Sequence, residues 1–179
     1  TYYVPNNATL VVVGDVSHEE VRRLAKKNFG WIPRCADPPR VTTVEPEQNG
    51  LRRLDIDEDN GPVPIAGIAF RTVPQGHPDA LPRQMHMQVL GGGESSRLYL
   101  ELVRRQDVAV VALGEYISFE QAGLAVAGGV SMPFGSVDDI VTGVWEQVEL
   151  VKEKGVTEQE LEKVRNTLYR NNVTESLAV

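Results

Sequence analysis

The sequence predicts an α+β domain with a mixed, largely antiparallel sheet. Apolar, β-branched runs typical of strands occur in irregular order with amphipathic helical stretches, whereas a doubly wound parallel sheet would alternate them regularly. Two of these runs, residues 108–116 and 123–132, are joined by a short polar turn and therefore predict an antiparallel hairpin. The chain has 179 residues, 41% of them hydrophobic. A chain of this length and hydrophobic content can bury one sizeable hydrophobic core, so we expect a single domain over residues 1–179.

The first predicted elements are a strand and a helix. ATLVVVGDV, at residues 8–16, is a short β-branched run that suits a buried strand. Ser17 and Glu20 have the spacing of a capping box, and Gly30 stands where a left-handed residue ends a helix. Between them one helical face is apolar, with Val21, Leu24, Ala25 and Phe29.

A proline-rich connection without periodicity, residues 33–50, leads to two further predicted strands. LRRLDIDED at residues 51–59 and VPIAGIAFRTV at residues 63–73 are separated by turn-forming residues, Asn60-Gly61-Pro62. We therefore expect both runs to lie in the sheet.

Two helices follow, separated by three glycines. Asp79 can cap the first helix, and Pro82 falls within its first turn, where the missing N–H is harmless. The glycines at residues 91–93 stop this helix, and Ser95 or Ser96 can cap the next one. The positions expected to face inward are Leu81, Met85 and Val89, then Leu98 and Leu102.

The last two predicted helices have clear start signals. Ser136 opens a helix through Val151, with Gly155 just beyond its end. Thr157 and Glu160 form another capping box. The apolar faces carry Ile140, Val144, Val148 and Val151 in the first helix and Leu161, Val164 and Leu168 in the second.

Composition and charge exclude several classes of partner. The formal net charge is −7 and the basic clusters are short and scattered, which excludes a nucleic-acid partner. No apolar run approaches the length of a membrane span. The first residues lack the charged and apolar regions of a signal peptide, and the last predicted helix reaches Val179 without a cap. We therefore expect a fragment cut from a longer chain at both ends. The acidic, cysteine-poor composition leads us to expect a bacterial protein of the cytoplasm or periplasm.

No complete catalytic or metal-binding constellation is visible in this chain. A phosphate-binding loop lies between a strand and a helix, whereas residues 91–93 follow a predicted helix. His18, His77 and His86 lack the one-turn spacing that lets two histidines face one zinc ion. The sequence contains no GxSxG motif, and the single Cys35 has no recognisable catalytic setting. We therefore predict no catalytic and no metal-binding residue here.

Two stretches nevertheless resemble a known family. PNNATLVVVGDV with its following helix, and LGGGESSRLY at the expected distance, look like the second domain of the M16 zinc metallopeptidases. This is the inverzincin family of insulinase, pitrilysin and mitochondrial processing peptidase. The resemblance covers nearly the whole chain. It implies the fold of LuxS and the processing peptidases, with the helices packed on one face of the sheet.

The resemblance also implies that the chemistry resides elsewhere in a longer protein. In that family an HxxEH helix and a downstream Glu, both in the first domain, hold zinc and activate water, and no HxxEH occurs here. The implied cofactor is zinc bound by that missing first domain. The implied partners are the first domain, a homologous second half or subunit, and peptide substrates enclosed in a clamshell chamber. This chain would be a non-zinc-binding wall of the chamber of an endopeptidase, inactive alone.

Within this resemblance, two positions and one loop bear on function. The half without zinc supplies an Arg and a Tyr that position substrate, and Val103 and Val110 align with them, which places this chain in the zinc-bearing half. In the processing peptidase a longer glycine-rich loop at this place is implicated in substrate recognition. The candidate groove residues here are Gly91, Gly92, Gly93, Ser95 and Ser96. The alternative interpretation of the three glycines is a helix break that permits close backbone approach.

A second function remains open beside the peptidase. Relatives of the same fold serve as noncatalytic core subunits of the cytochrome bc1 complex or as inactive peptidase partners. An HxxEH motif in the domain before Thr1 would distinguish the enzyme from such a structural paralogue.

Overall fold

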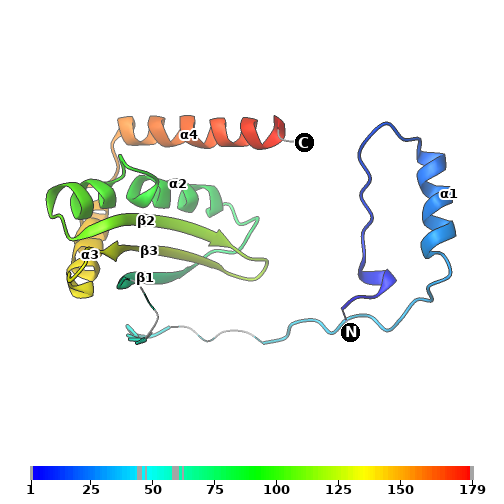
Figure 1. The fold of residues 1–179 in the computed structure, drawn as a ribbon, viewed down its shortest axis with the longest axis horizontal. Coiled ribbons are helices and arrows are strands. Elements are labelled where there is room, and N and C mark those ends of the chain that lie inside the picture. Colours follow the sequence, from blue (N-terminus) through cyan, green and yellow to red (C-terminus); the bar gives the residue numbers. More distant parts are fainter. Residues whose placement is uncertain (1, 44–45, 47, 58–60, 62, 178–179) are drawn as a thin grey trace. The chain divides into compact units, whose positions relative to one another are not determined.

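The computed structural model describes residues 2–43, 46, 48–57, 61 and 63–177 (Figure 1). The chain divides into two compact units, Thr1–Asp55 and Ile56–Val179. Each unit is described by itself.

The described residues of the first unit include one α-helix. A short 3-10 helix, η1 (Pro5–Asn7), precedes α1 (His18–Phe29). Ser17 Oγ accepts a hydrogen bond from the backbone N–H of Glu20 at 3.2 Å, which confirms the predicted cap. Gly30 has φ −67°, so the prediction of a left-handed residue at this helix end is wrong.

The two strands predicted in and next to the first unit are not found. Residues 8–16 and 51–57 belong to no strand, and residues 58 and 59 of the second run lie outside the described residues, as do Asn60 and Pro62 of the predicted turn. β-Branched residues form a strand only where they can pair with a neighbouring strand and pack against a surface. None of the described residues among 2–55 is buried, so this unit offers the apolar run at 8–16 no such surface.

The second unit is built on a three-stranded antiparallel sheet. Its strands are β1 (Ile65–Thr72), β2 (Ala109–Ser118) and β3 (Gly123–Ser131), in the order β1-β3-β2. Ala127 of the central strand faces Ile68 on one side and Gly114 on the other. The strand predicted at 63–73 and the predicted hairpin are confirmed, and with them the α+β fold class.

The helices pack against one face of this sheet. They are α2 (Ala80–Gly91), the π-helical segment η2 (Tyr99–Arg105), α3 (Val137–Lys154) and α4 (Glu158–Leu177). α2 and α3 contact the strands, and α4 lies on α2 (Figure 1). Trp145 of α3 meets Phe70 of β1 edge to face, with ring centroids 5.5 Å apart. The buried core between these layers includes Ile68, Met87, Leu90, Leu98, Leu102, Ala125, Ala127, Ile140 and Val144.

The predicted side-chain cap is found at the start of α3 but not at the start of α2. Ser136 Oγ accepts a hydrogen bond from the backbone N–H of Asp138 at 3.2 Å and so caps α3 as predicted. Asp79 precedes α2 but its side chain makes no capping hydrogen bond. Instead its backbone N–H donates to Nδ1 of His77 at 3.1 Å. The position predicted for the cap is therefore correct, but the predicted side-chain cap is not formed.

α2 approaches β2 so closely that only glycine fits where they meet. A Cβ built on Gly91 would lie 1.9 Å from the backbone nitrogen of Gly114 and 2.4 Å from its Cα. These distances are far below ordinary contact, so no side chain can be accommodated without separating the helix from the strand. The first of the three glycines therefore serves the close backbone approach that was the alternative interpretation of this stretch.

We expect Gly91→Ala to lower the free energy of unfolding by about 3 kcal/mol, because the added methyl must push α2 away from β2 and loosen the core. Denaturant unfolding followed by circular dichroism measures this. Gly50→Ala is the control, since a Cβ there meets nothing within 4 Å, and it should change stability by less than about 0.5 kcal/mol. Equal midpoints for the two variants would contradict the close approach.

Candidate functional site

The glycine-serine loop, residues 91–96, turns the chain from α2 toward η2. The backbone N–H of Ser96 donates to the carbonyl of Gly93 at 3.0 Å, which closes the turn. Gly93 has φ +87°, in the left-handed region that glycine adopts without strain. Ser96 Oγ accepts from the backbone N–H of Tyr99 at 3.4 Å. Of the two serines predicted as the cap, Ser96 takes this role.

The five candidate groove residues are adjacent but differ in exposure. Gly91 and Ser96 are buried, Gly92 is half-buried, and Gly93 and Ser95 are exposed. A buried residue cannot touch a substrate without a rearrangement, so in this arrangement only the tip of the loop is available to another molecule. That the stretch borders a substrate groove stays a prediction.

Arg97, directly after the serines, ties the loop to the start of α4. Its Nε donates to Oε1 of Glu160 at 2.7 Å, and its Nη2 donates to Oε2 at 2.8 Å. The same Nη2 donates to the carbonyl of Gly155 at 2.9 Å. Such bidentate pairing of a guanidinium with a carboxylate fixes the relative orientation of the two groups as well as their distance. We call the contact between Arg97 and Glu160 the α4 clamp.

Glu160 is also part of the capping box of α4. Its Oε2 accepts from the backbone N–H of Thr157 at 2.7 Å, while its own N–H donates to Thr157 Oγ1 at 3.3 Å. The hydrogen bonds from Arg97, followed by those from Thr157, lower the pKa of Glu160 to about 2 against the opposing effect of burial. Both partners of the α4 clamp are therefore charged at neutral pH.

Half of this arrangement is predicted by the sequence. The spacing of Thr157 and Glu160 predicts the capping box, which is confirmed, but no signal linked it to Arg97, 63 residues earlier. Pairing between such distant residues depends on how the helices pack, which a single sequence does not specify. The SSR run gives only the general signal that an arginine can form a bidentate pair with a carboxylate.

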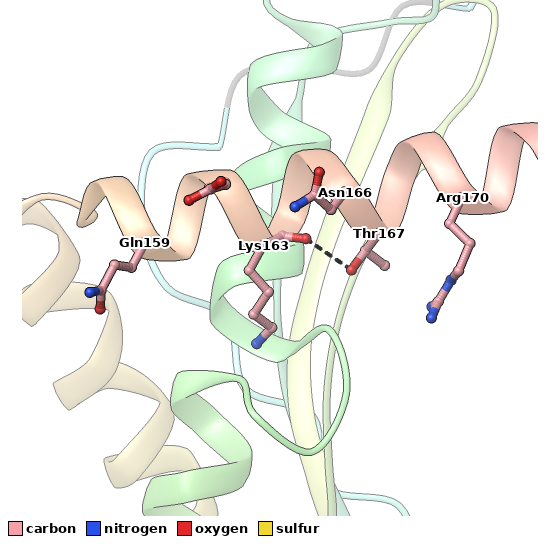
Figure 2. A pocket seen from close by; sticks show the side chains of 6 residues that line it. Gln159, Lys163, Asn166, Thr167 and Arg170 are labelled. Atoms are coloured by element: carbon pink, nitrogen blue, oxygen red, sulfur yellow. Dashed lines mark hydrogen bonds between the residues drawn. The ribbon is translucent and has the colours of Figure 1, made fainter.

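An open polar hollow lies along one face of α4 (Figure 2). Its lining residues are Gln159, Glu162, Lys163, Asn166, Thr167 and Arg170. Lys163 Nζ donates to the carbonyl of Ser95 at 2.9 Å, which joins the hollow to the loop tip. Thr167 Oγ1 donates to the carbonyl of Lys163 at 3.0 Å, the dashed line in Figure 2. The sequence gives no sign of this hollow, because polar positions on a helix indicate only exposure.

The histidines form no metal site. Among the described residues, no three His, Cys, Asp or Glu side chains lie close enough to hold a metal ion. His18 begins α1, His77 precedes α2, and His86 lies on α2. Burial, with the nearby positive charges of Arg83 and Arg97, lowers the pKa of His86, so this imidazole is neutral at neutral pH. In the part of the chain that the structure describes, no helix is both long and apolar enough to cross a bilayer.

The positions aligned with the family's Arg and Tyr carry ordinary apolar side chains. Val103 lies in η2 and packs partly buried against the core, and Val110 lies exposed on β2. Arg105 and Tyr116, which lie close to these two positions in the sequence, are the alternative pair, and both bond elsewhere in the chain. Arg105 forms an ion pair with a glutamate four residues earlier, and the hydroxyl of Tyr116 donates to a backbone carbonyl just after β1 at 2.9 Å. Arg105 and Tyr116 thus each have a partner other than one another.

Residues 1–168 match the family described as the peptidase M16 inactive domain. The chain belongs to the peptidase M16 family. This confirms the resemblance carried by the PNNATLVVVGDV and LGGGESSRLY stretches, and it identifies the chain as the inactive domain type of the family.

Named relatives of this M16 domain include proteases. The zinc protease PqqE of Helicobacter pylori is 28% identical over 168 residues, which cover 92% of this chain and 37% of PqqE. The crystal structure of a protease from Helicobacter pylori superposes with a TM-score of 0.87 at 24% identity, over 97% of this chain and 42% of that one. The periplasmic protease PqqL of Escherichia coli gives a TM-score of 0.74 at 20% identity, over 96% of this chain and 20% of PqqL. The chain thus spans about two fifths of the length of the curated relatives it matches.

We expect Glu160→Gln to reduce the free energy of unfolding at pH 7 by about 1–3 kcal/mol, because charge-assisted hydrogen bonds to Arg97 are lost. The pKa of Glu160 is lowered on folding from 4.5 to about 2. The contribution is therefore fully present above about pH 4.5 and is lost as the pH falls toward about 2. Denaturant unfolding of both proteins across this range should show their stabilities converging.

Glu149→Gln is the matched control. Glu149 pairs with Lys152 at 2.7 Å, but both side chains are largely exposed, so its loss should cost less than about 0.5 kcal/mol. A stability difference for Glu160→Gln that persists unchanged at low pH would contradict the charged clamp.

Proposed function

We propose that this M16 inactive domain is the non-zinc-binding domain of a zinc-dependent endopeptidase that degrades or processes peptides. The observation that carries the proposal is the match of residues 1–168 to the inactive domain of a peptidase family. The relative from Helicobacter pylori is named a zinc protease and extends far beyond the matched stretch. The proposal therefore assigns the chemistry to another domain of a longer polypeptide.

In this proposal the zinc ion is held outside the present chain. Zinc in a catalytic site needs three protein ligands and an open position, and the described residues offer no group of three candidate side chains. An HxxEH helix and a downstream Glu in a first domain of the same polypeptide would hold it. A homologous second half or subunit would close the clamshell over the peptide.

The present chain would contribute part of the chamber wall as one domain spanning residues 1–179. The exposed loop tip at Gly93 and Ser95, with the adjacent α4 hollow, supports this role. The hollow presents amide, hydroxyl and charged groups of both signs, which suits hydrogen bonding to peptide backbones of varied sequence. Val103 and Val110 favour the zinc-bearing half, because valine can neither donate a hydrogen bond to a peptide carbonyl nor stabilise a developing oxyanion.

The complete polypeptide should bind one zinc ion and cleave unfolded peptides, whereas the 179-residue chain should do neither, because it lacks the ligand set. Metal analysis after chelation and zinc reloading, together with hydrolysis of a fluorogenic peptide library, measures both properties. One tightly held zinc per 179-residue chain would contradict the proposal. A complete polypeptide without zinc or hydrolysis would make this the noncatalytic paralogue.

Replacing both valines, as Val103→Arg with Val110→Tyr, should add no activity to the complete peptidase, since its partner half supplies the corresponding pair. The value of kcat/KM per folded protein is the measurement, because a charge at half-buried Val103 also costs stability. Arg105→Ala and Tyr116→Phe should leave turnover within about threefold of the parent, a change below 1 kcal/mol in barrier height. A sharp loss of turnover in these two variants would instead place the chain in the substrate-positioning half.

A further inference from the structure

α4 lies on the rest of the second unit along one side of α2 (Figure 1). The α2 residues at this contact are three or four positions apart and so share one helical face. Between the two helices runs an apolar groove lined by Pro82, Met85, His86, Val89, Val156, Leu161 and Arg165. Val89 and Val164 are 4% and 3% exposed, yet neither belongs to the main core. The contact is therefore a small apolar surface of its own, which we call the α4 seam.

His86 places a titratable group in this apolar contact. Its imidazole is half-buried beside Met85, Val89 and Leu161. A neutral imidazole suits such surroundings, whereas an imidazolium must give up part of its hydration there. No acidic side chain of the described residues lines the groove. The charged form would therefore gain no carboxylate partner within the α4 seam.

The charged groups around this imidazole come from α2, from α4 and from the end of the glycine-serine loop. Arg83 lies almost one turn earlier on α2, and Arg97 follows the loop. Arg165 lines the groove from α4. Two of these three cations have acids of their own, since Arg97 pairs with Glu160 at 2.7 Å and Arg165 lies 3.6 Å from Glu158. A proton on the imidazole would therefore add a further positive charge beside Arg83.

The direction of the pKa shift decides how acid acts on this contact. Burial, followed by the positive charges of Arg83 and Arg97, lowers the pKa of His86 from its ordinary value of 6.5. When α4 lifts from α2 the imidazole is hydrated and regains that ordinary value. The α4 seam is therefore fully stable above about pH 6.5 and loses stability as the pH falls below it.

We infer that the α4 seam is an acid-sensitive contact, in which protonation of His86 lowers the free-energy cost of lifting α4 from α2. The α4 clamp stays charged in this range, because the pKa of Glu160 is about 2, so the first turn of α4 remains tethered. Lys163 donates to the carbonyl of Ser95, and lifting α4 breaks this bond as well. Mild acid thereby frees the exposed tip of the glycine-serine loop.

Hydrogen–deuterium exchange of the complete polypeptide, followed by mass spectrometry of peptides from α4, tests the inference. A helix of this length that has lost its packing surface is marginal in water, so its amides exchange when it lifts. After correction for intrinsic exchange rates, we expect exchange in α4 to rise about threefold or more between about pH 7.5 and about pH 5.5. Exchange in α3, which packs on the sheet, is the internal reference and should not rise.

Four variants assign the response to the imidazole. His86→Gln and His86→Leu cannot be protonated, so each should abolish the rise in α4 whatever it does to the rate at pH 7.5. Arg83→Gln should reduce the rise, because the loss of a nearby positive charge brings the pKa of His86 back toward its ordinary value. His77→Gln, which removes an exposed histidine just before α2, should leave the rise intact.

Three results would overturn the inference. The first is exchange in α4 of the parent protein that does not change with pH. The second is a rise that persists in both His86 variants or disappears in His77→Gln. The third is an equal rise in α3, which would show that acid loosens the whole second unit and not the α4 seam.

Discussion

The arrangement of the second unit depends on the contact between α2 and β2 at Gly91 and Gly114. Neither residue has a side chain, and a Cβ on Gly91 would overlap the backbone of Gly114. The helix therefore lies directly on the strand, which brings Met87 and Leu90 into the same core as Ala127. Because α2 ends at this contact, the position of the glycine-serine loop is set by packing. The loop is thus buried at its two ends and exposed only at its tip.

The α4 clamp extends this arrangement to the last helix. Arg97 follows the loop immediately and holds Glu160 and the carbonyl of Gly155, while Lys163 holds the carbonyl of Ser95. Salt bridges at a surface usually contribute little, but this one is only partly exposed and uses both carboxylate oxygens. Its role is to place the polar face of α4 beside the loop tip. The glycine-serine loop resembles a ligand-binding loop in sequence, but most of its residues pack α2 against β2 or position α4.

An inactive domain in a peptidase still needs surfaces that hold the assembly together. The helix-covered side of the sheet forms the core of the second unit, while Ile65, Val111 and Leu113 on its strands are exposed aliphatic side chains. The first unit likewise buries none of its described residues. Apolar surface of this extent is costly in water. Both features fit the proposed role of the chain as one domain of a longer protein.

The sequence by itself determined the features that depend on neighbours along the chain. The caps at Ser17, Ser136 and Thr157, the hairpin of β2 and β3, and the family resemblance follow from local spacing and composition, and they are confirmed. Tertiary structure decided what depends on distant partners. The run at residues 8–16 has strand propensity but no strand beside it, and Arg97 finds Glu160 only because α2 and α4 pack together. Propensity acts over a few residues, whereas sheet pairing, burial and ion pairing require surfaces that folding alone brings together.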